Sequence, residues 1–378
     1  MAPYDVIILG LGAMGSAAAY HLARRGRRVL GLEQFTPAHD RGASHGRSRI
    51  IREAYFEGPR YVPLIRRAYE LWDTLQQASG ARLLLPTGGL MIGPEDSELV
   101  QGALASARQH DLRHELLSRA DLRRRFAQFA AEEATVAVWE PRAGALFPED
   151  CIRAHLAGAT RAGAVLQFEE PVRQWHAAGD TVEVTTAGGI YSAGRLIVTA
   201  GPWAGQVLPR LGLPLEVERN VMYWFRPRDP ALFTPDRCPV YIYEYAPRRL
   251  VYGFPALRAD GIKVAHHHSG ELCTPETIRR DVGEDEIQGM RGLLARYLPE
   301  ANGELLQTAT CMYTNTPDGH FIIDRHPDHA SVTIACGFSG HGFKFSPVIG
   351  EALAEFCEYG HTRHDIELFR LRRFASPV

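Results

Sequence analysis

Three glycines near the N-terminus have the spacing of a dinucleotide-binding turn. Gly10, Gly12 and Gly15 form a GxGxxG motif. In this motif the first glycine permits a tight turn, the second lets the backbone approach a pyrophosphate, and the third lets a helix pack closely on a strand. Glu33 lies 18 residues after Gly15, where a carboxylate accepts hydrogen bonds from ribose hydroxyls. The motif predicts a bound dinucleotide but does not separate FAD from NAD.

A second glycine-rich stretch lies near the C-terminus. Residues 336–344 read CGFSGHGFK, between a predicted strand at 332–336 and a predicted helix at 347–358. A strand–helix junction so far from the first in sequence suits the other end of an elongated cofactor, for which an NAD enzyme has less need. The alternative is an ordinary connection with no ligand.

The elements around these motifs belong to an α/β protein. Residues 4–9 form a continuous apolar run typical of a buried parallel strand, 16–25 have helical spacing, and 28–32 return as a strand. Residues 36–50 predict a polar loop. Residues 220–270 alternate and are rich in aromatic side chains, which predicts an antiparallel sheet.

The order of these signals predicts two interleaved domains. The fold class is α/β: a Rossmann-like FAD-binding domain with an inserted antiparallel-sheet (α+β) catalytic domain. We expect the FAD-binding domain to use residues 1–80, 145–215 and 320–378, and the catalytic domain to use residues 81–144 and 216–319.

Composition excludes several other classes. With 45% hydrophobic and 23% charged residues the 378-residue chain is globular rather than disordered, and a net charge of −2 gives no basic footprint for nucleic acid. No apolar run reaches the roughly 18 residues of a membrane helix, and the N-terminal stretch lacks the features of a secretory signal. Six cysteines without a CxxC pair do not form a disulfide framework. We therefore expect a cytoplasmic protein without nucleic-acid or membrane partners.

Four sequence blocks carry a resemblance to a known family. The chain resembles the monomeric sarcosine oxidase family, which includes N-methyltryptophan oxidase, within the D-amino-acid-oxidase-like flavoproteins. The blocks are DVIILGLGAMGSAAAYHLARRG (5–26), GASHGRSRIIREAYFEGPRYVPL (42–64), GFP followed by IKVAHHH (253–268), and CMYTNTPDGHFIID with GFSGHGFKF (311–324 and 337–345).

The resemblance implies a reaction. A monomeric FAD enzyme would oxidise the N-methyl C–N bond of a small N-methyl amino acid with O2, giving the amino acid, formaldehyde and hydrogen peroxide. N-methyltryptophan, N-methylalanine, proline and pipecolate remain alternative substrates. Two other classes also remain: an NAD-dependent dehydrogenase, which rests on GxGxxG alone, and a non-catalytic flavoprotein. A scaffold would have no need of Arg49, Arg52, Lys263 and Lys344 together.

The resemblance also implies how FAD is held. Cys311 would bind FAD covalently, as a thioether to the 8α-methyl of the isoalloxazine, although a cysteine in this setting is by itself typical of a buried core. Arg49 would lie close to the flavin ring and stabilise negative charge on it, and His45 in the SHG loop would lie beside it. The full set of implied cofactor contacts is Gly10, Gly12, Ala13, Met14, Gly15, Glu33, Ser44, His45, Arg49, Val172, Gly201, Trp203, Cys311, Gly340, His341, Gly342, Phe343 and Lys344.

Arg52 and Lys344 match the residues that bind the substrate carboxylate. A guanidinium binds a carboxylate bidentately. Two cations near a mostly apolar pocket are costly without an anionic partner, so we expect both to converge on that carboxylate. The i, i+3 spacing of Arg49 and Arg52 on a helical or turning segment would let them face the same way. Tyr252 and Tyr313 match aromatic residues of the pocket.

Lys263 matches a lysine placed over the reactive face of the flavin. A fixed ammonium there lowers the barrier for electron transfer to O2. His267 lies four residues later, on the same face of a strand, and matches an active-site histidine. Strand alternation separates it from His266 and His268, so this run predicts no metal site.

The chain departs from the family pattern beside the carboxylate arginine. Many members have Gly-Asp-Thr where this chain has Gly46, Arg47 and Ser48, and RHAY where it has Glu53 after Arg52. We expect these changes to affect the choice of substrate side chain more than the reaction.

Overall fold

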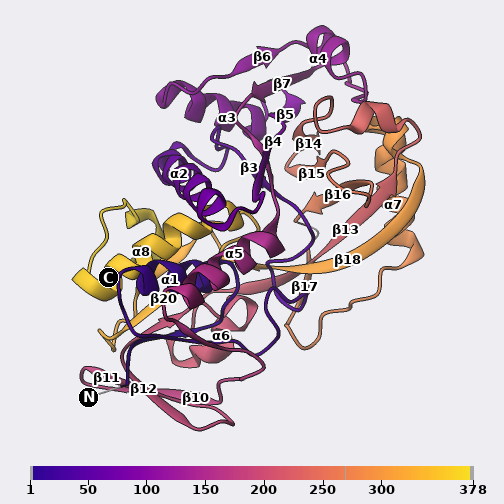
Figure 1. Cartoon of the computed structure of the whole chain (residues 1–378). Coiled ribbons are helices and arrows are strands. Elements are labelled where there is room, and N and C mark those ends of the chain that lie inside the picture. The colour runs from indigo at the N-terminus through magenta and orange to yellow at the C-terminus, as the bar shows by residue number, and fades with distance from the viewer. Residues whose placement is uncertain (1–2, 269, 375–378) are drawn as a thin grey trace.

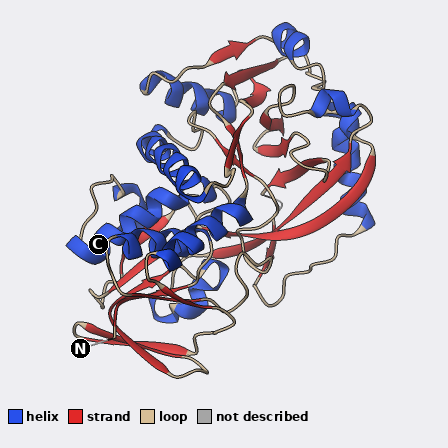
Figure 2. Ribbon diagram, viewed as in Figure 1, coloured by secondary structure: helices blue, strands red, loops and turns tan. Residues whose placement is uncertain are grey.

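A computed structural model describes residues 3–268 and 270–374 and contains two large β-sheets and one small sheet (Figures 1 and 2). The first sheet has eight strands in the order β10-β11-β12-β1-β2-β9, with β20 also paired to β12 and β19 to β20. Its parallel centre, β9, β2, β1, β12 and β20, confirms the α/β fold class. The bounds are β1 Tyr4–Leu9, β2 Val29–Leu32, β9 Val165–Gln167, β10 Gln174–Ala178, β11 Thr181–Thr185, β12 Ile190–Val198, β19 Ile322–Arg325 and β20 Val332–Cys336.

The second sheet has nine strands in the order β17-β13-β16-β15-β14-β5-β7-β6, with β18 on the other side of β13. It is antiparallel as predicted, except that β14 pairs with β5 in parallel. The long strands β13 and β18 curve across the molecule in Figure 1. The bounds are β5 Gly89–Pro94, β6 Glu115–Leu117, β7 Thr135–Glu140, β13 Glu216–Arg226, β14 Val240–Ala246, β15 Arg249–Phe254, β16 Ile262–His267, β17 Glu271–Cys273 and β18 Glu304–Asn315.

A small antiparallel sheet holds the segment with the two arginines. It consists of β3 Arg49–Ile51, β8 Gly144–Leu146 and β4 Leu84–Pro86. The expectation of a helical or turning segment at Arg49 and Arg52 is therefore wrong. The β-branched Ile50 and Ile51 favour a strand, and pairing of Ile50 with Ala145 of β8 fixes it.

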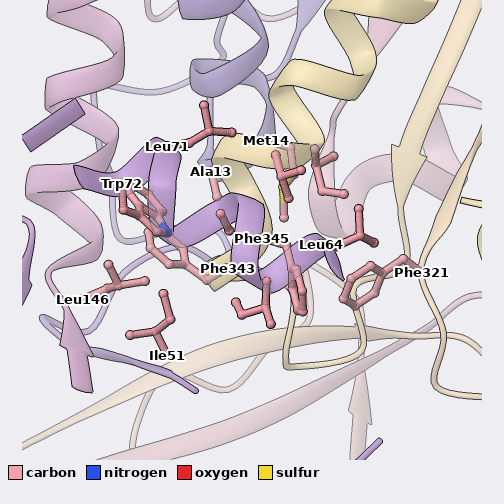
Figure 3. Close-up of a cluster of buried hydrophobic side chains, with 14 of the residues drawn as sticks. Ala13, Met14, Ile51, Leu64, Leu71, Trp72, Leu146, Phe321, Phe343 and Phe345 are labelled. Carbon is pink, nitrogen blue, oxygen red and sulfur yellow. The ribbon is translucent and has the colours of Figure 1, made fainter. Parts of the chain in front are cut away.

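Helices α1, α5 and α8 contact strands of the parallel sheet, whereas α3 and α4 contact strands of the second sheet. Helix α1 packs against α5 and α8, and α2 packs against α8. The buried cluster in Figure 3 joins Met14 of α1, Trp72 of α2 and Phe343 and Phe345 of the C-terminal turn, so the two glycine-rich segments share one core. The helices are α1 Ala13–Arg24, α2 Val62–Ser79, α3 Glu98–Gln109, α4 Arg119–Arg125, α5 Pro148–Arg161, α6 Ala204–Val207, α7 Glu284–Tyr297 and α8 Ser346–Tyr359.

The two sheets draw on separate parts of the chain. Strands of the first come from residues 4–32, 165–198 and 322–336, and strands of the second from 89–140 and 216–315. The domain boundaries themselves stay a prediction. Within the described residues, every helix is too short or too polar to cross a membrane. All six cysteines are free thiols.

Candidate active site

An elongated cavity of about 610 Å³ runs along the carboxyl edge of the parallel sheet. This volume lies within the range of cofactor and ligand sites. Many of the predicted cofactor contacts line it: Gly10, Gly12, Ala13, Met14, Glu33, Ser44, Arg49, Val172, Gly201, Trp203, Gly340, Gly342 and Phe343. Gly15, His45 and Cys311 do not line it, and His341 and Lys344 line an adjoining cavity instead.

The three motif glycines have different physical reasons to lack a side chain. Gly10 has φ +90°, and a Cβ there would lie 2.6 Å from the carbonyl oxygen of Thr199. A Cβ on Gly15 would lie 1.8 Å from the carbonyl oxygen of Gly10. A Cβ on Gly12 would meet no protein atom nearer than Ser44 Oγ at 3.7 Å. Packing therefore requires Gly10 and Gly15, whereas the open space at Gly12 suits the close approach of a ligand.

The start of α1 offers a phosphate site. Its N-cap residue, Gly12, has no side chain to cap the helix. Ser44 Oγ accepts from Ala13 N at 3.4 Å, and the positive end of the helix dipole favours an anion here. Glu33 stands at the end of β2, where its carboxylate accepts from Leu11 N at 2.8 Å and Phe35 N at 3.1 Å. These bonds hold the carboxylate at the cavity edge with further lone pairs for ribose hydroxyls. The glycine turn, this carboxylate and the elongated shape fit FAD.

A smaller cavity, of about 60 Å³, adjoins the inner end of the first. Four residues line both cavities: Arg49, Tyr313, Gly340 and Phe343. The smaller cavity also contacts all the remaining residues predicted to bind substrate, together with one predicted catalytic residue: Arg52, Tyr252, Lys344 and His267. The structure thus brings these side chains together from β3, β15, β16, β18 and the C-terminal turn.

Arg52 has an anionic partner within the protein. Its Nη2 donates to both carboxylate oxygens of Glu57, at 2.7 and 2.6 Å, and its guanidinium lies over the rings of Tyr55 and Phe56. Burial alone would raise the pKa of Glu57, but the charge and hydrogen bonds of Arg52 bring it down to about 2. Arg52 thus already has an anionic partner within the protein, and its convergence with Lys344 on a substrate carboxylate stays a prediction.

Lys344 lies on the other side of the same aromatic group. Its Nζ donates to the carbonyl of His341 at 2.8 Å and to the Tyr55 hydroxyl at 3.4 Å, and it lies 5.2 Å from the centre of the Tyr55 ring. Burial and the charge of Arg52 lower the pKa of Lys344 to about 7, against the attraction of Glu57. The two cations are therefore neighbours around one tyrosine.

His267 supplies a neutral imidazole to the small cavity. Its Nδ1 lies 3.4 Å from the hydroxyl of Tyr313. Burial, with the neighbouring His268, holds the pKa of His267 well below its usual range. The ring therefore stays uncharged at neutral pH and can accept or donate a hydrogen bond.

Lys263 is buried beneath the loop that carries His45. It lies on β16 opposite Trp224 of β13, and its Nζ donates to the carbonyls of Gly46 and Ser48 at 2.8 and 2.9 Å. Burial and the charge of Arg49 hold the pKa of Lys263 well below its ordinary value. Burial, together with Arg49 and Lys263, lowers the pKa of His45 to about 3, and His45 Nε2 has no hydrogen-bond partner among the residues that the structure describes.

Arg49 links the loop, the cavities and Cys311. Its Nη2 donates to the carbonyl of Ala43 at 3.0 Å and lies 3.5 Å from Cys311 Sγ. Cys311 is buried on β18, next to Met312 and Tyr313, which line the large cavity. Arg49 therefore places a cation within 3.5 Å of the Cys311 sulfur.

Several site residues escaped the sequence analysis. Glu57 holds Arg52, and Phe56 and Ile242 line the small cavity. Glu140 accepts from Glu53 N and Ala54 N at 2.7 and 2.8 Å and so fixes the backbone after Arg52. Only Glu57 had a signal in the sequence, namely a carboxylate five residues from a cation that needs a partner.

A glycine turn for pyrophosphate, an elongated cavity and a small cationic cavity at its end define a dinucleotide-dependent oxidoreductase. A family model described as FAD dependent oxidoreductase matches residues 5–356, and the chain belongs to this family. This confirms the flavoprotein class and the family predicted from the sequence.

Named relatives match over nearly the whole chain. A Streptomyces avermitilis protein named monomeric sarcosine oxidase is 51% identical over 377 residues, covering 99% of this chain and 98% of that protein. An N-methyl-L-tryptophan oxidase of Yersinia pestis is 36% identical over 375 residues, covering 98% and 99%. The solved structure of NikD, described as an unusual amino acid oxidase essential for nikkomycin biosynthesis, superposes with a TM-score of 0.85 at 25% identity and covers 98% of each chain.

Proposed function

We propose that the chain is a FAD-dependent oxidase of the sarcosine oxidase type. It would oxidatively demethylate a small N-methyl amino acid with O2, producing the amino acid, formaldehyde and hydrogen peroxide. The observation that carries the proposal is the pair of buried cations, Arg52 and Lys344, around Tyr55 in a small cavity that adjoins the dinucleotide cleft. The relative at 51% identity, itself named a sarcosine oxidase, supports it.

FAD bound in the large cavity would accept two electrons from the substrate and pass them to O2. The residues suited to hold it are Gly12 and the start of α1 for the pyrophosphate, Glu33 for the ribose, and Arg49 and the segment 340–343 at the inner end. The small cavity adjoins that end, so a substrate bound there would lie next to the bound cofactor.

The substrate carboxylate would pair with Lys344 and Arg52. For Nη2 of Arg52 to bind it, that nitrogen would have to release Glu57, because Nη2 donates to both Glu57 oxygens. Holding the carboxylate fixes the N-methyl group in one place and removes most of its orientational freedom. The cations Arg49, Arg52 and Lys344 also disfavour a charged substrate amine, since like charges lower the pKa of a neighbouring ammonium. A neutral amine keeps the lone pair that oxidation requires.

The size of the cavity favours a small substrate. Its volume is only about 60 Å³, and the bulky side chains of Phe56, Ile242 and Phe343 line it. An indole side chain would need these residues to move. We therefore place sarcosine above N-methyltryptophan, although relatives at 36% identity are named for the latter.

We also propose that FAD is attached covalently through Cys311. The thiol lies beside Arg49 and next to residues that line the cavity. Mass spectrometry of denatured protein should show the chain plus one FAD less two hydrogens, and Cys311→Ala should show the bare chain. Cys336→Ala, which also changes a buried thiol, is the matched control and should keep the adduct. Bare chain in a fully loaded wild type would refute the attachment.

We further propose a monomer in a reducing cytoplasm. The names of relatives include the word monomeric, and six free thiols suit a reducing compartment. Size-exclusion chromatography with light scattering tests the first point.

A substrate panel tests the function itself. Sarcosine, N-methyl-L-alanine, L-proline, L-pipecolate and N-methyl-L-tryptophan are each mixed with holoenzyme and O2, and peroxide and formaldehyde are measured. We expect equal amounts of both products from sarcosine and the highest kcat/KM with it. Peroxide without formaldehyde, from proline or pipecolate alone, would show a cyclic amino acid oxidase instead.

A further inference from the structure

The loop above Lys263 contains a strained turn. Gly46 and Arg47 have φ angles of +101° and +65°, and Ser48 N donates to the carbonyl of Gly46 at 2.8 Å. A hydrogen bond over three residues with a positive central φ is a rare and strained γ-turn. A side chain in this conformation is strained, so other contacts must hold Arg47 there.

The turn points two carbonyl groups at one ammonium. The residues on either side of Arg47, Gly46 and Ser48, provide the oxygens that Lys263 Nζ contacts at 2.8 and 2.9 Å. An ammonium has three N–H donors. Two bonds to the turn therefore fix the direction of the third, which is the donor left for a partner outside the loop.

The side chain of Arg47 ties the turn to the sheet that carries Lys263. It contacts Asp260 at 2.9 Å and Gln307 Oε1 at 2.7 Å, and its guanidinium lies 5.3 Å from the centre of the Trp224 ring. Asp260 precedes Lys263 by three residues, and Trp224 is the register partner of Lys263.

The backbone of the turn is held from the opposite direction. One carboxylate oxygen of Glu149, at the start of α5, accepts from Gly46 N and Arg47 N at 2.8 and 3.0 Å. The turn is thus fixed between α5 and the second sheet, and the Arg47 side chain provides the contacts to the sheet.

We propose that Arg47 is a positioning residue for the reaction with O2. Its contacts with Asp260, Gln307 and Trp224 maintain the strained turn, and the turn aims Lys263. This inference rests on the proposed function only in assuming that Lys263 serves O2 reduction. Arg47 lines neither cavity. It can therefore affect the oxidation of substrate only indirectly, through the loop.

The decisive variant is Arg47→Asn. Asparagine tolerates a positive φ, so the backbone survives while the contacts to Asp260, Gln307 and Trp224 are lost. Arg41→Ala is the matched control, because Arg41 is an exposed arginine of the same loop. Among the described residues, its side chain makes only a long contact, with Asp40. Asp260→Asn removes the partner charge and leaves Arg47 in place.

Each holoenzyme is reduced with dithionite and mixed with O2 in a stopped-flow instrument. Because a misplacement of about 1 Å can cost up to about 100-fold, we expect reoxidation to slow by about tenfold or more in Arg47→Asn and by less in Asp260→Asn. The double variant should be no slower than Arg47→Asn. Anaerobic reduction by sarcosine should stay within about twofold of wild type, and Arg41→Ala should match wild type in both steps.

A second readout does not depend on turnover. Hydrogen–deuterium exchange of a peptide covering 42–50 should be faster in Arg47→Asn than in wild type or Arg41→Ala. Unchanged reoxidation in Arg47→Asn, or equal slowing of reduction and reoxidation, would overturn the proposal. If wild type is not reduced by any N-methyl amino acid, the proposed function fails, yet the dithionite experiment still tests Arg47.

Discussion

The two cavities depend on different parts of the chain, one on backbone conformation and the other on charged side chains. Beside the large cavity the glycine turn is shaped by backbone, with Gly10 and Gly15 packed so tightly that a Cβ has no space. The small cavity is shaped by side chains, including the buried cations Arg52 and Lys344. The geometry of a site made of backbone is fixed once the chain folds. The binding properties of a site made of buried charges depend on the interactions among those charges. Substitutions in the glycine turn should therefore act through steric overlap. Ligand binding in the small cavity should change gradually with charge substitutions and with pH.

The largest effect should come from the glycine turn. In Gly15→Ala the new Cβ would lie 1.8 Å from a backbone oxygen, so we expect a loss of stability of at least roughly 3 kcal/mol, the upper range for overpacking. Gly12→Ala should leave the apoprotein as stable as wild type but abolish FAD binding. Thermal unfolding of apoproteins and FAD titration measure the two effects. Equal behaviour of the variants would contradict the division of roles.

Lys263 stands between the two regions and should give the next effect. Lys263→Met removes a charge and leaves the carbonyls of Gly46 and Ser48 without their donor. Removing one preorganised donor commonly costs about 3–4 kcal/mol, roughly 10²–10³ in rate. We expect the rate constant for reaction with O2, measured by stopped flow, to fall by this factor. A wild-type rate constant would remove Lys263 from the mechanism.

The two cations of the small cavity should not be equivalent. Lys344→Ala should weaken binding of methylthioacetate by the roughly 1.5–3 kcal/mol of a charged hydrogen bond, about 10- to 150-fold. Arg52→Ala should weaken it less, because wild type must first break the pair between Arg52 and Glu57. Glu57→Gln should tighten binding. Titrations of the flavin spectrum give the three dissociation constants, and full wild-type affinity in both cation variants would place the carboxylate elsewhere.

The smallest effect is a pH dependence. The pKa of Lys344 is lowered to about 7 by burial and Arg52, so its charged form is present below that pH and is lost as pH rises. An anionic ligand binds the charged form, and the dissociation constant of methylthioacetate should therefore rise above pH 7, by at most about tenfold per unit for one proton. Lys344→Met should flatten the profile. A constant affinity up to pH 9 would assign the binding to Arg52 alone.

The difference between the glycine turn and the small cavity also explains which features the sequence could predict. Strands β1 and β20 were predicted with the bounds that they have, since runs of buried β-branched residues are local signals. Helix α1 begins at Ala13, three residues before the prediction, because the glycine turn leads directly into the helix. The turn and its helix form one local unit, so their place at the large cavity follows from the motif.

The small cavity is formed by residues that lie far apart in the sequence. Arg52 and Lys344 meet at Tyr55 only because α2 and the C-terminal turn share a core, seen in Figure 3 around Trp72 and Phe343. The pairing of Arg52 with Glu57 depends on the path of the backbone after β3, which Glu140 fixes from another sheet. No spacing rule reports such contacts, and the resemblance to a family could name the residues but not their partners.

Under the proposed function, Glu57 competes with the substrate carboxylate for Arg52. A carboxylate tethered five residues away acts at a high effective concentration, typically millimolar for short linkers. A free carboxylate must compete with Glu57 before it binds Arg52. Small acids that offer only a negative charge should therefore bind weakly. An amino acid that also fills the cavity has additional binding energy with which to displace Glu57. Selectivity for substrate over other carboxylates then depends in part on the free energy needed to separate Glu57 from Arg52.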